Sequence, residues 1–263
     1  MMRILTSVVG GGVFIAMTWF GGWAFVGLMA VIALAGQKEA FNLFSTPEQQ
    51  TGNLMAFLAG MAIIFTPAWP PAVWFLAPLA IGSLAWFLLR APGGQPLATL
   101  GGSLFGLFYP CLFLASLVAI RLPHREVLWD PFVVTMGLVL LMWTADSAAY
   151  YSGRTFGRRK LAPTLSPGKT WEGAISGGIA ALVAAAVFSE IWSGGLPLIH
   201  WLALAGLVGV LGPLGDLFES ALKRAAGTKD SASILPGHGG LLDRFDALIF
   251  VAPVAAAYLF GLV

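Results

Sequence analysis

The sequence predicts an all-α, polytopic integral membrane protein with about nine transmembrane helices. Of its 263 residues, 58% are hydrophobic and 10% are charged, whereas a soluble domain carries about 25% charged residues. Apolar runs close to the length of a membrane span, about 20 residues, recur along the whole chain. The Lys and Arg residues gather in alternate connections between those runs. These three observations together carry the prediction.

The expected spans follow from the order of the apolar runs. The first two are divided only by Gly21 and Gly22, and the third and fourth by a tight turn at Pro70 and Pro71. Thr170 is expected to cap the helix that contains the seventh run. The nine expected spans are 4–20, 22–37, 54–68, 72–89, 98–120, 131–151, 173–193, 198–218 and 245–262.

The connections fall into two sets that differ in positive charge. Twelve of the 14 Lys and Arg residues lie in one set, and only Arg121 and Arg125 lie in the other. Cytoplasmic loops are enriched in Lys and Arg, so the first set is expected to face the cytoplasm. This favours an odd number of spans. The cation-rich set comprises the N-terminus, 38–53, 90–97, 152–172 and 219–244.

The chain, residues 1–263, is expected to form a single membrane domain. Residues 1–143 supply the N-terminal spans, and residues 144–263 form a catalytic part with two cytoplasmic loops. Sixteen of the 26 charged residues lie in 144–173 and 216–246. The net charge of +2 and the lack of a basic stripe argue against nucleic acid as a partner.

Two isolated residues receive simple interpretations. Cys111 lies in an apolar run and is expected to be a small buried hydrophobe. As the single cysteine, it excludes intrachain disulfides. Glu39 lies close to the end of the second expected span, and we expect an interfacial rather than a buried side chain.

Residues 215–227, GDLFESALKRAAG, place a polar stripe on the helix that continues the eighth span. Gly227 is expected to cap that helix. A carboxylate at Asp216 is costly near the membrane, so positive charge is expected beside it. An internal ion pair with Lys223 is the simple structural alternative. The stripe has the spacing of one helix face and consists of Asp216, Glu219, Ser220, Lys223 and Arg224.

The segment LLDRFD adds Asp243 and Asp246, which are spaced i, i+3 at the start of the ninth span. With Asp216 they make three carboxylates from two helix ends, and oxygen ligands of this kind suit Mg²⁺. Without a metal, one acid at this place is explained by the favourable interaction of a negative charge with a helix N-terminus. That interaction explains a second acid less well. In the preceding turn, PGHGG, glycines let backbone N–H groups approach a phosphate, although His238 alone fits an interfacial residue equally well.

Cations near these acids suit phosphate groups. Lys169 stands beside a Pro-Gly turn, and Asp146 lies within the sixth span near its cytoplasmic end. A polybasic patch for anionic lipid headgroups is the alternative, but it leaves the interleaved acids unexplained. The other cations that can hold phosphate oxygens are Lys223, Arg224, Lys229 and Arg244.

These residues resemble the signature of the phosphatidate cytidylyltransferases, the CDP-diacylglycerol synthases. The segment SPGKTWEG, with the preceding Asp146 and Gly153, also resembles that family. The specific resemblance covers roughly residues 144–250. The matching signature positions are Ser220, Leu222, Lys223, Arg224, Lys229, Asp230, Leu235, Pro236, His238, Gly239, Gly240, Asp243, Arg244 and Asp246.

The resemblance implies that CTP and phosphatidic acid react to give CDP-diacylglycerol and pyrophosphate. It implies Mg²⁺ as cofactor, held by Asp216 and Asp243 with Asp246 as a further ligand or a neighbour of one, and it allows a monovalent cation such as K⁺ beside it. Lys223 is expected to take part in catalysis. The expected phosphate-binding residues are Lys169, Lys223, Arg224, Lys229, Ser220, His238 and Arg244.

The resemblance also implies a setting for the enzyme. We expect contact with membrane lipids, a homodimer, and a place in the bacterial cytoplasmic (inner) membrane with the active site facing the cytoplasm.

Two other functions fit part of the pattern. A cation-coupled transporter would use Asp146 and Asp216 to line a pathway, but transport sites usually lie near the midplane between repeats, and the sequence shows no obvious repeat. Another nucleotide-dependent lipid phosphotransferase, such as a CDP-alcohol phosphotransferase or a polyprenol kinase, is the second alternative. The DGxxAR stretch of the former is absent.

Overall fold

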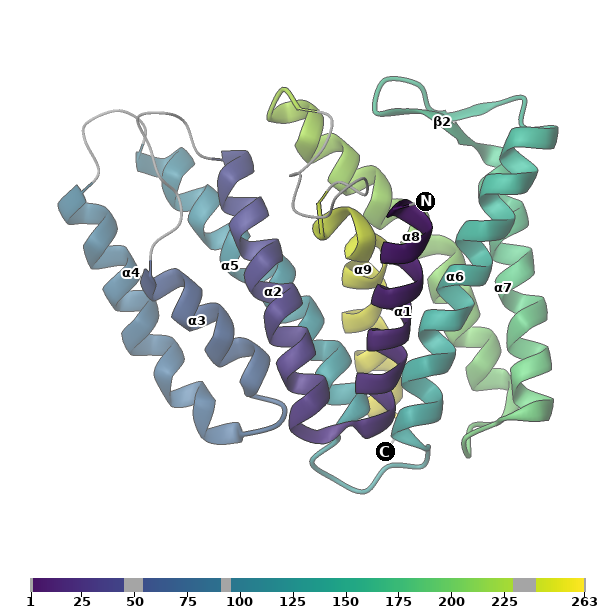
Figure 1. Cartoon of the computed structure of the whole chain (residues 1–263), viewed down its shortest axis with the longest axis horizontal. Coiled ribbons are helices and arrows are strands. Elements are labelled where there is room, and N and C mark those ends of the chain that lie inside the picture. Colours follow the sequence, from purple (N-terminus) through teal and green to yellow (C-terminus); the bar gives the residue numbers. More distant parts are fainter. Residues whose placement is uncertain (1, 45–53, 91–95, 229–239, 263) are drawn as a thin grey trace. The chain divides into compact units, whose positions relative to one another are not determined.

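The computed structural model describes residues 2–44, 54–90, 96–228 and 240–262 (Figure 1). The chain forms two compact units. The N-terminal unit consists of Met1–His124 with Ala226–Arg244, and the C-terminal unit of Arg125–Ala225 with Phe245–Val263.

The described residues form nine α-helices, a short 3₁₀ helix and one β-hairpin. Each of the nine expected spans overlaps an α-helix. The elements are α1 (Met2–Phe20), α2 (Gly22–Phe44), α3 (Leu54–Phe65), η1 (Pro70–Phe75), α4 (Leu76–Arg90), α5 (Pro96–Arg121), α6 (Pro131–Phe156), β1 (Lys160–Ala162), β2 (Ser166–Thr170), α7 (Trp171–Ile191), α8 (Leu198–Ala225) and α9 (Leu242–Phe260).

Five of these helices, α2, α5, α6, α7 and α8, are long and apolar enough to cross a membrane. The prediction of a predominantly α-helical protein is therefore confirmed for the described residues, and five of its helices are candidate membrane spans. The number of nine crossings is not confirmed, because the other helices are shorter or less apolar.

In the N-terminal unit, α2 packs against α3 and α5, and α3 also packs against α4. The guanidinium group of Arg121 donates to the backbone carbonyls of Thr18 and Trp19, at 2.8 and 3.2 Å, and so ties the end of α5 to the end of α1. Cys111 is fully buried, as predicted. At Pro70 the chain forms the 3₁₀ helix η1 instead of the expected tight turn.

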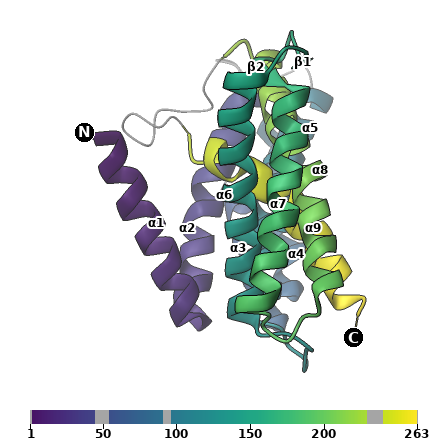
Figure 2. The same cartoon turned by 90° about the vertical axis from the view of Figure 1, so that its right-hand side faces the viewer.

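In the C-terminal unit, α6, α7 and α8 lie side by side (Figure 2). Small residues let them approach closely: a Cβ atom added at Gly177 of α7 would lie 2.8 Å from the carbonyl oxygen of Ala145 on α6. Such small-residue contacts are typical of helices packed within membranes. Leu138, Leu141 and Trp201 are among the fully buried side chains of this unit.

The connection between α6 and α7, part of the cation-rich set, contains an antiparallel hairpin. Lys160 pairs with Thr170, and Ala162 with Ser166. The Thr170 hydroxyl oxygen then accepts a hydrogen bond from the Gly173 N–H at 3.1 Å. This confirms the predicted cap and fixes where the hairpin ends and α7 begins.

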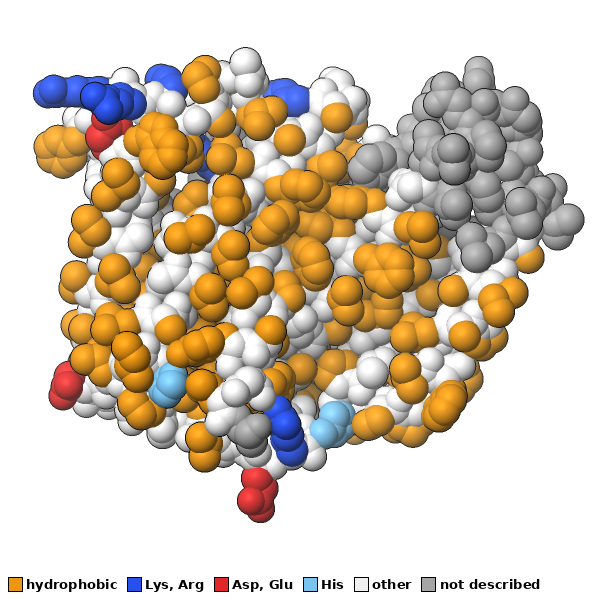
Figure 3. Space-filling view, turned by 180° about the vertical axis from the view of Figure 1, so that it is seen from behind, with side chains coloured by type: hydrophobic (Ala, Val, Ile, Leu, Met, Phe, Trp, Pro, Cys, Tyr) orange, Lys and Arg blue, Asp and Glu red, His pale blue; other side chains and the backbone are white. Residues whose placement is uncertain are grey.

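The outer face of α7 is apolar. Hydrophobic side chains are also spread over the described part of the surface drawn in Figure 3, and the charged ones lie mainly near its two ends. An exposed apolar face of this length would be unfavourable in water, and it supports an integral membrane protein. The exposed side chains of α7 include Ile175, Ile179, Leu182, Val183 and Val187.

Candidate active site

Helix α8 carries the polar stripe beyond the expected end of its span. Its 28 residues correspond to about 42 Å at the rise of an α-helix, longer than the roughly 30 Å hydrocarbon core of a bilayer. The last turns of α8 can therefore lie beyond the hydrocarbon core, and they carry polar side chains. Glu219 is fully buried, Ser220 is half-buried and Arg224 is exposed.

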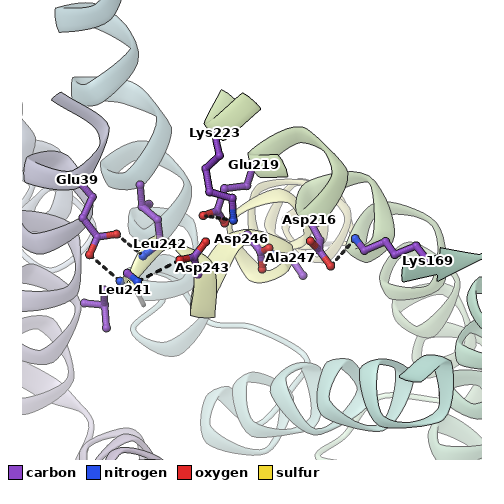
Figure 4. A network of polar contacts seen from close by, with 11 residues as sticks. Glu39, Lys169, Asp216, Glu219, Lys223, Leu241, Leu242, Asp243, Asp246 and Ala247 are labelled. Carbon is purple, nitrogen blue, oxygen red and sulfur yellow. Dashed lines mark hydrogen bonds and ion pairs between the residues drawn. The ribbon is translucent and has the colours of Figure 1, made fainter. Parts of the chain in front are cut away.

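The carboxylate of Asp216 forms an ion pair with the ammonium group of Lys169 on β2 (Figure 4). The two side chains are 44% and 23% exposed, so the pair remains open to a ligand. The simple alternative of a pair between Asp216 and Lys223 is wrong. Lys223 instead lies 3.4 Å from Glu219 on the same helix, because that i, i+4 spacing places the two side chains on one face.

Asp246 on α9 lies beside the same part of α8. Gly215 allows this approach, since a Cβ atom there would lie 2.6 Å from the backbone carbonyl oxygen of Asp246. One Asp246 carboxylate oxygen accepts from the Ala247 N–H at 2.7 Å. The charged neighbours of Asp246 include Asp216 and Lys169.

Asp146 on α6 belongs to the same set of charges, with Asp216 and Lys169 as its charged neighbours. It lines a small pocket between α6, α7 and α8, whose walls include Gly177 and Pro213. In the C-terminal unit, Asp216 and Lys169 are thus charged neighbours of both Asp146 on α6 and Asp246 on α9. We call these four residues the acidic cluster.

The acidic cluster combines three carboxylates with one ammonium group. Clustered carboxylates repel one another unless a cation lies among them, and Lys169 supplies part of that charge. The carboxylate oxygens suit a hard divalent cation, which typically uses one or two carboxylates together with waters and phosphate oxygens. Among the described residues, no group of three or more Asp, Glu, His or Cys side chains is placed so that it could hold a metal ion.

Glu172 holds the hairpin against the start of α7. Its carboxylate accepts hydrogen bonds from the backbone N–H groups of Arg158, at 3.1 Å, and Arg159, at 3.2 Å. The Trp171 N–H also donates to the Arg159 carbonyl at 3.0 Å. These contacts fix β2, the strand that carries Lys169.

The remaining predicted site residues lie elsewhere. Asp243 and Arg244 belong to the N-terminal unit. One Asp243 carboxylate oxygen accepts from the Gly240 N–H at 3.0 Å, and the Arg244 side chain is exposed. Lys229 and His238 lie outside the described residues.

The sequence interpretation of Glu39 was also wrong. This residue was expected at the interface, but its side chain is fully buried. Helix α2 runs on to Phe44, so Glu39 lies inside a helix rather than beyond a span. The general rule that an ionisable residue within a membrane helix marks a functional or paired position was the signal that could have identified it.

Comparison with known proteins places these features in a family. A model of the cytidylyltransferase family matches residues 1–262. The match therefore includes both units, the acidic cluster and Glu39.

Individual relatives agree with the family match. The phosphatidate cytidylyltransferase of Brucella suis biovar 1 is 35% identical over 269 residues, covering 98% of this chain and 92% of that protein. The protein of the same name from Synechocystis sp. is 30% identical, covering 96% of this chain and 94% of that protein. The Haemophilus influenzae phosphatidate cytidylyltransferase is 42% identical over 155 residues, which cover 56% of this chain and 53% of that protein.

Proposed function

The chain belongs to the cytidylyltransferase family, and from that membership we propose that it is a phosphatidate cytidylyltransferase. It transfers CMP from CTP to phosphatidic acid and gives CDP-diacylglycerol and pyrophosphate, a step of phospholipid biosynthesis. An oxygen of the lipid phosphate attacks the α-phosphorus of CTP. The bond from that phosphorus to the bridging oxygen breaks, and pyrophosphate leaves with the bonding electrons.

The family match carries this proposal, and the acidic cluster supports it as a place where Lys169 and bound cations can meet phosphate groups. Both reactants are anions, so the residues around them have to neutralise negative charge and hold the two phosphates in line. Lys169 is the ammonium group of the cluster and lies at the ion pair with Asp216. In the complex we expect Lys169 to bind a phosphate oxygen of the nucleotide. The attacking phosphate is already ionised near neutral pH, so no side chain has to remove a proton from it.

We propose that Asp216 and Asp246 hold Mg²⁺, and that Asp243, one helical turn before Asp246 on α9, is a further ligand. The fit rests on donor chemistry: carboxylate oxygens are the protein ligands that Mg²⁺ prefers, and few are needed when phosphates complete the coordination. When bound, Mg²⁺ neutralises phosphate charge and stabilises the leaving pyrophosphate. A monovalent cation such as K⁺ beside it belongs to the same proposal.

Further phosphate contacts are proposed for the last turns of α8 and the segment after it. Lys223 is held near Glu219 and Arg224 is exposed, so both can reach a headgroup or nucleotide phosphate. The remaining proposed phosphate ligands are Ser220, Lys229, His238 and Arg244.

We propose a setting in the bacterial cytoplasmic membrane, with the acidic cluster facing the cytoplasm. The excess of Lys and Arg in one set of connections supports this orientation. Phosphatidic acid would then enter from the bilayer, and CTP from the cytosol. A homodimer is proposed on the family resemblance.

A two-substrate assay tests the proposed function. The purified protein is reconstituted in liposomes with CTP labelled at the α-phosphorus, phosphatidic acid and Mg²⁺. We expect label in the lipid phase and an equal release of pyrophosphate, both of which require phosphatidic acid. Folded protein that transfers no label would contradict the proposal, and ion flux without nucleotide turnover would favour a transporter.

A further inference from the structure

Glu39 is a buried acid of the N-terminal unit. Its side chain is 0% exposed, and it lies on α2, one of the helices that can cross a membrane. A carboxylate buried in such a place is unfavourable unless polar groups bind it. Its partners therefore indicate why an acid stands there.

Both carboxylate oxygens of Glu39 bind the start of α9. Oε1 accepts from the Leu241 N–H at 2.6 Å, and Oε2 accepts from the Leu242 N–H at 2.9 Å (Figure 4). The first N–H groups of a helix have no partner within the helix, and a negative charge at that end is favoured by the helix dipole. Glu39 thus caps α9 with a side chain from another helix.

The backbone of α2 packs directly against the same residues. A Cβ atom at Gly36, one turn before Glu39, would lie 3.1 Å from both Leu242 Cδ2 and Pro110 Cβ. Leu242 is 3% exposed. The start of α9 is therefore fixed by a polar contact and by an apolar one, and both come from α2.

The next residue of α9 is Asp243, whose Oδ2 accepts from the Gly240 N–H at 3.0 Å. Helices that cap themselves use a side chain near their first turn to bind the first N–H groups. In α9, Glu39 binds the N–H groups of Leu241 and Leu242 instead. The Asp243 carboxylate is not needed for those two groups, and its direction depends on how α9 begins.

We propose that Glu39 is a positioning residue, which sets the start of α9 and thereby orients the carboxylate of Asp243. The catalytic part of this inference rests on the proposed function, because it treats Asp243 as a metal ligand. The structural part does not.

Hydrogen–deuterium exchange tests the structural part. The Glu39→Gln variant keeps the size of the side chain but loses its charge, and the amides of Leu241 and Leu242 should then exchange about tenfold faster or more, since bonds to charged groups are the stronger ones. The matched control is Gln37→Leu, because Gln37 is a buried side chain of α2 that donates to the Ala56 carbonyl on α3 at 3.2 Å. The control should leave exchange at Leu241 and Leu242 unchanged.

Steady-state kinetics tests the catalytic part on the same proteins. For Glu39→Gln we expect kcat, per folded enzyme, to fall about tenfold while KM for CTP changes less than twofold, which corresponds to a misdirected ligand rather than a lost substrate contact. A purely structural role would lower the yield of folded protein and leave kcat unchanged. The Gln37→Leu control should keep the wild-type kcat.

The outcomes distinguish the structural part of the inference from the catalytic part. Unchanged exchange at Leu241 and Leu242 overturns the cap, and faster exchange with normal kcat overturns the positioning role. If Glu39→Gln does not fold, Gly36→Ala disturbs the same contact more gently, and faster exchange at these amides with lower kcat would support the inference, whereas wild-type values would overturn it. If the wild-type protein makes no CDP-diacylglycerol, the proposed function fails, and the exchange experiment still decides whether Glu39 holds α9.

Discussion

Lys169 and Asp216 form an ion pair that joins β2 to α8. The two residues are separated by most of α7 and α8 in the sequence, yet they meet because α7 and α8 pack side by side. The pair places a cation beside the acids of the acidic cluster before any nucleotide binds. In the proposed reaction, Lys169 binds the Asp216 carboxylate before CTP is present and a phosphate of CTP afterwards.

Replacing Lys169 should therefore weaken nucleotide binding. For Lys169→Gln we expect KM for CTP to rise roughly tenfold to a hundredfold, the range for losing a hydrogen bond to a charged group. The matched control is Lys160→Gln, because Lys160 is an exposed lysine in the same hairpin. Equal KM values for the two variants would remove Lys169 from the nucleotide site.

Asp216→Asn should abolish turnover without unfolding the protein. The substitution keeps the shape of the side chain but removes the charge, and losing one preorganised electrostatic contact typically lowers kcat about a hundredfold or more. Glu190→Gln serves as the control, since Glu190 is an exposed acid at the far end of α7. CDP-diacylglycerol formation from labelled CTP measures the effect, and a near-normal rate in Asp216→Asn would contradict the assignment.

Gly215→Ala should separate α8 from α9 at the acidic cluster. Its new methyl group would meet the Asp246 carbonyl oxygen at 2.6 Å, closer than van der Waals contact allows, so one helix has to shift. Enzymes lose about a hundredfold in rate when reacting groups are misplaced by about 1 Å, and we expect kcat to fall by that order. Gly206→Ala on the same helix has no heavy atom within 4 Å and should keep wild-type kcat; a parallel loss in both variants would refute the explanation.

Thr170→Val should destabilise the start of α7. The hydroxyl oxygen caps the Gly173 N–H, and losing such a cap costs about 0.5–2 kcal/mol of stability. Thermal unfolding in detergent should show a lower midpoint for Thr170→Val and a near-normal one for Thr170→Ser, which retains the hydroxyl group. If the two variants unfold together, the cap does not stabilise this junction.

Hydropathy and side-chain spacing together predicted where the helices lie. The eighth expected span stopped at residue 218, but the polar stripe over 215–227 predicted that its helix continues, and α8 runs on to Ala225. The hairpin was not predicted. Its strands have three and five residues, too few to show the alternation on which strand prediction depends.

The acidic residues of the site could be predicted from the sequence, but the residues that pair with them could not. Spacing along one helix suggested Lys223 for Asp216, whereas the packing of α7 and α8 supplies Lys169. Glu39 binds backbone groups about 200 residues away in the chain. Local patterns contain no information about such contacts, which depend on how helices meet.

The central claim is that Asp216 and Asp246, from two neighbouring helices, hold a divalent cation together with the nucleotide. Its most direct test is the binding of Mn²⁺, a paramagnetic substitute for Mg²⁺, followed by electron paramagnetic resonance on purified protein with and without CTP. We predict that CTP tightens Mn²⁺ binding to the wild type, and that Asp216→Asn and Asp246→Asn each weaken it at least about tenfold. Wild-type Mn²⁺ affinity in both variants would contradict the claim.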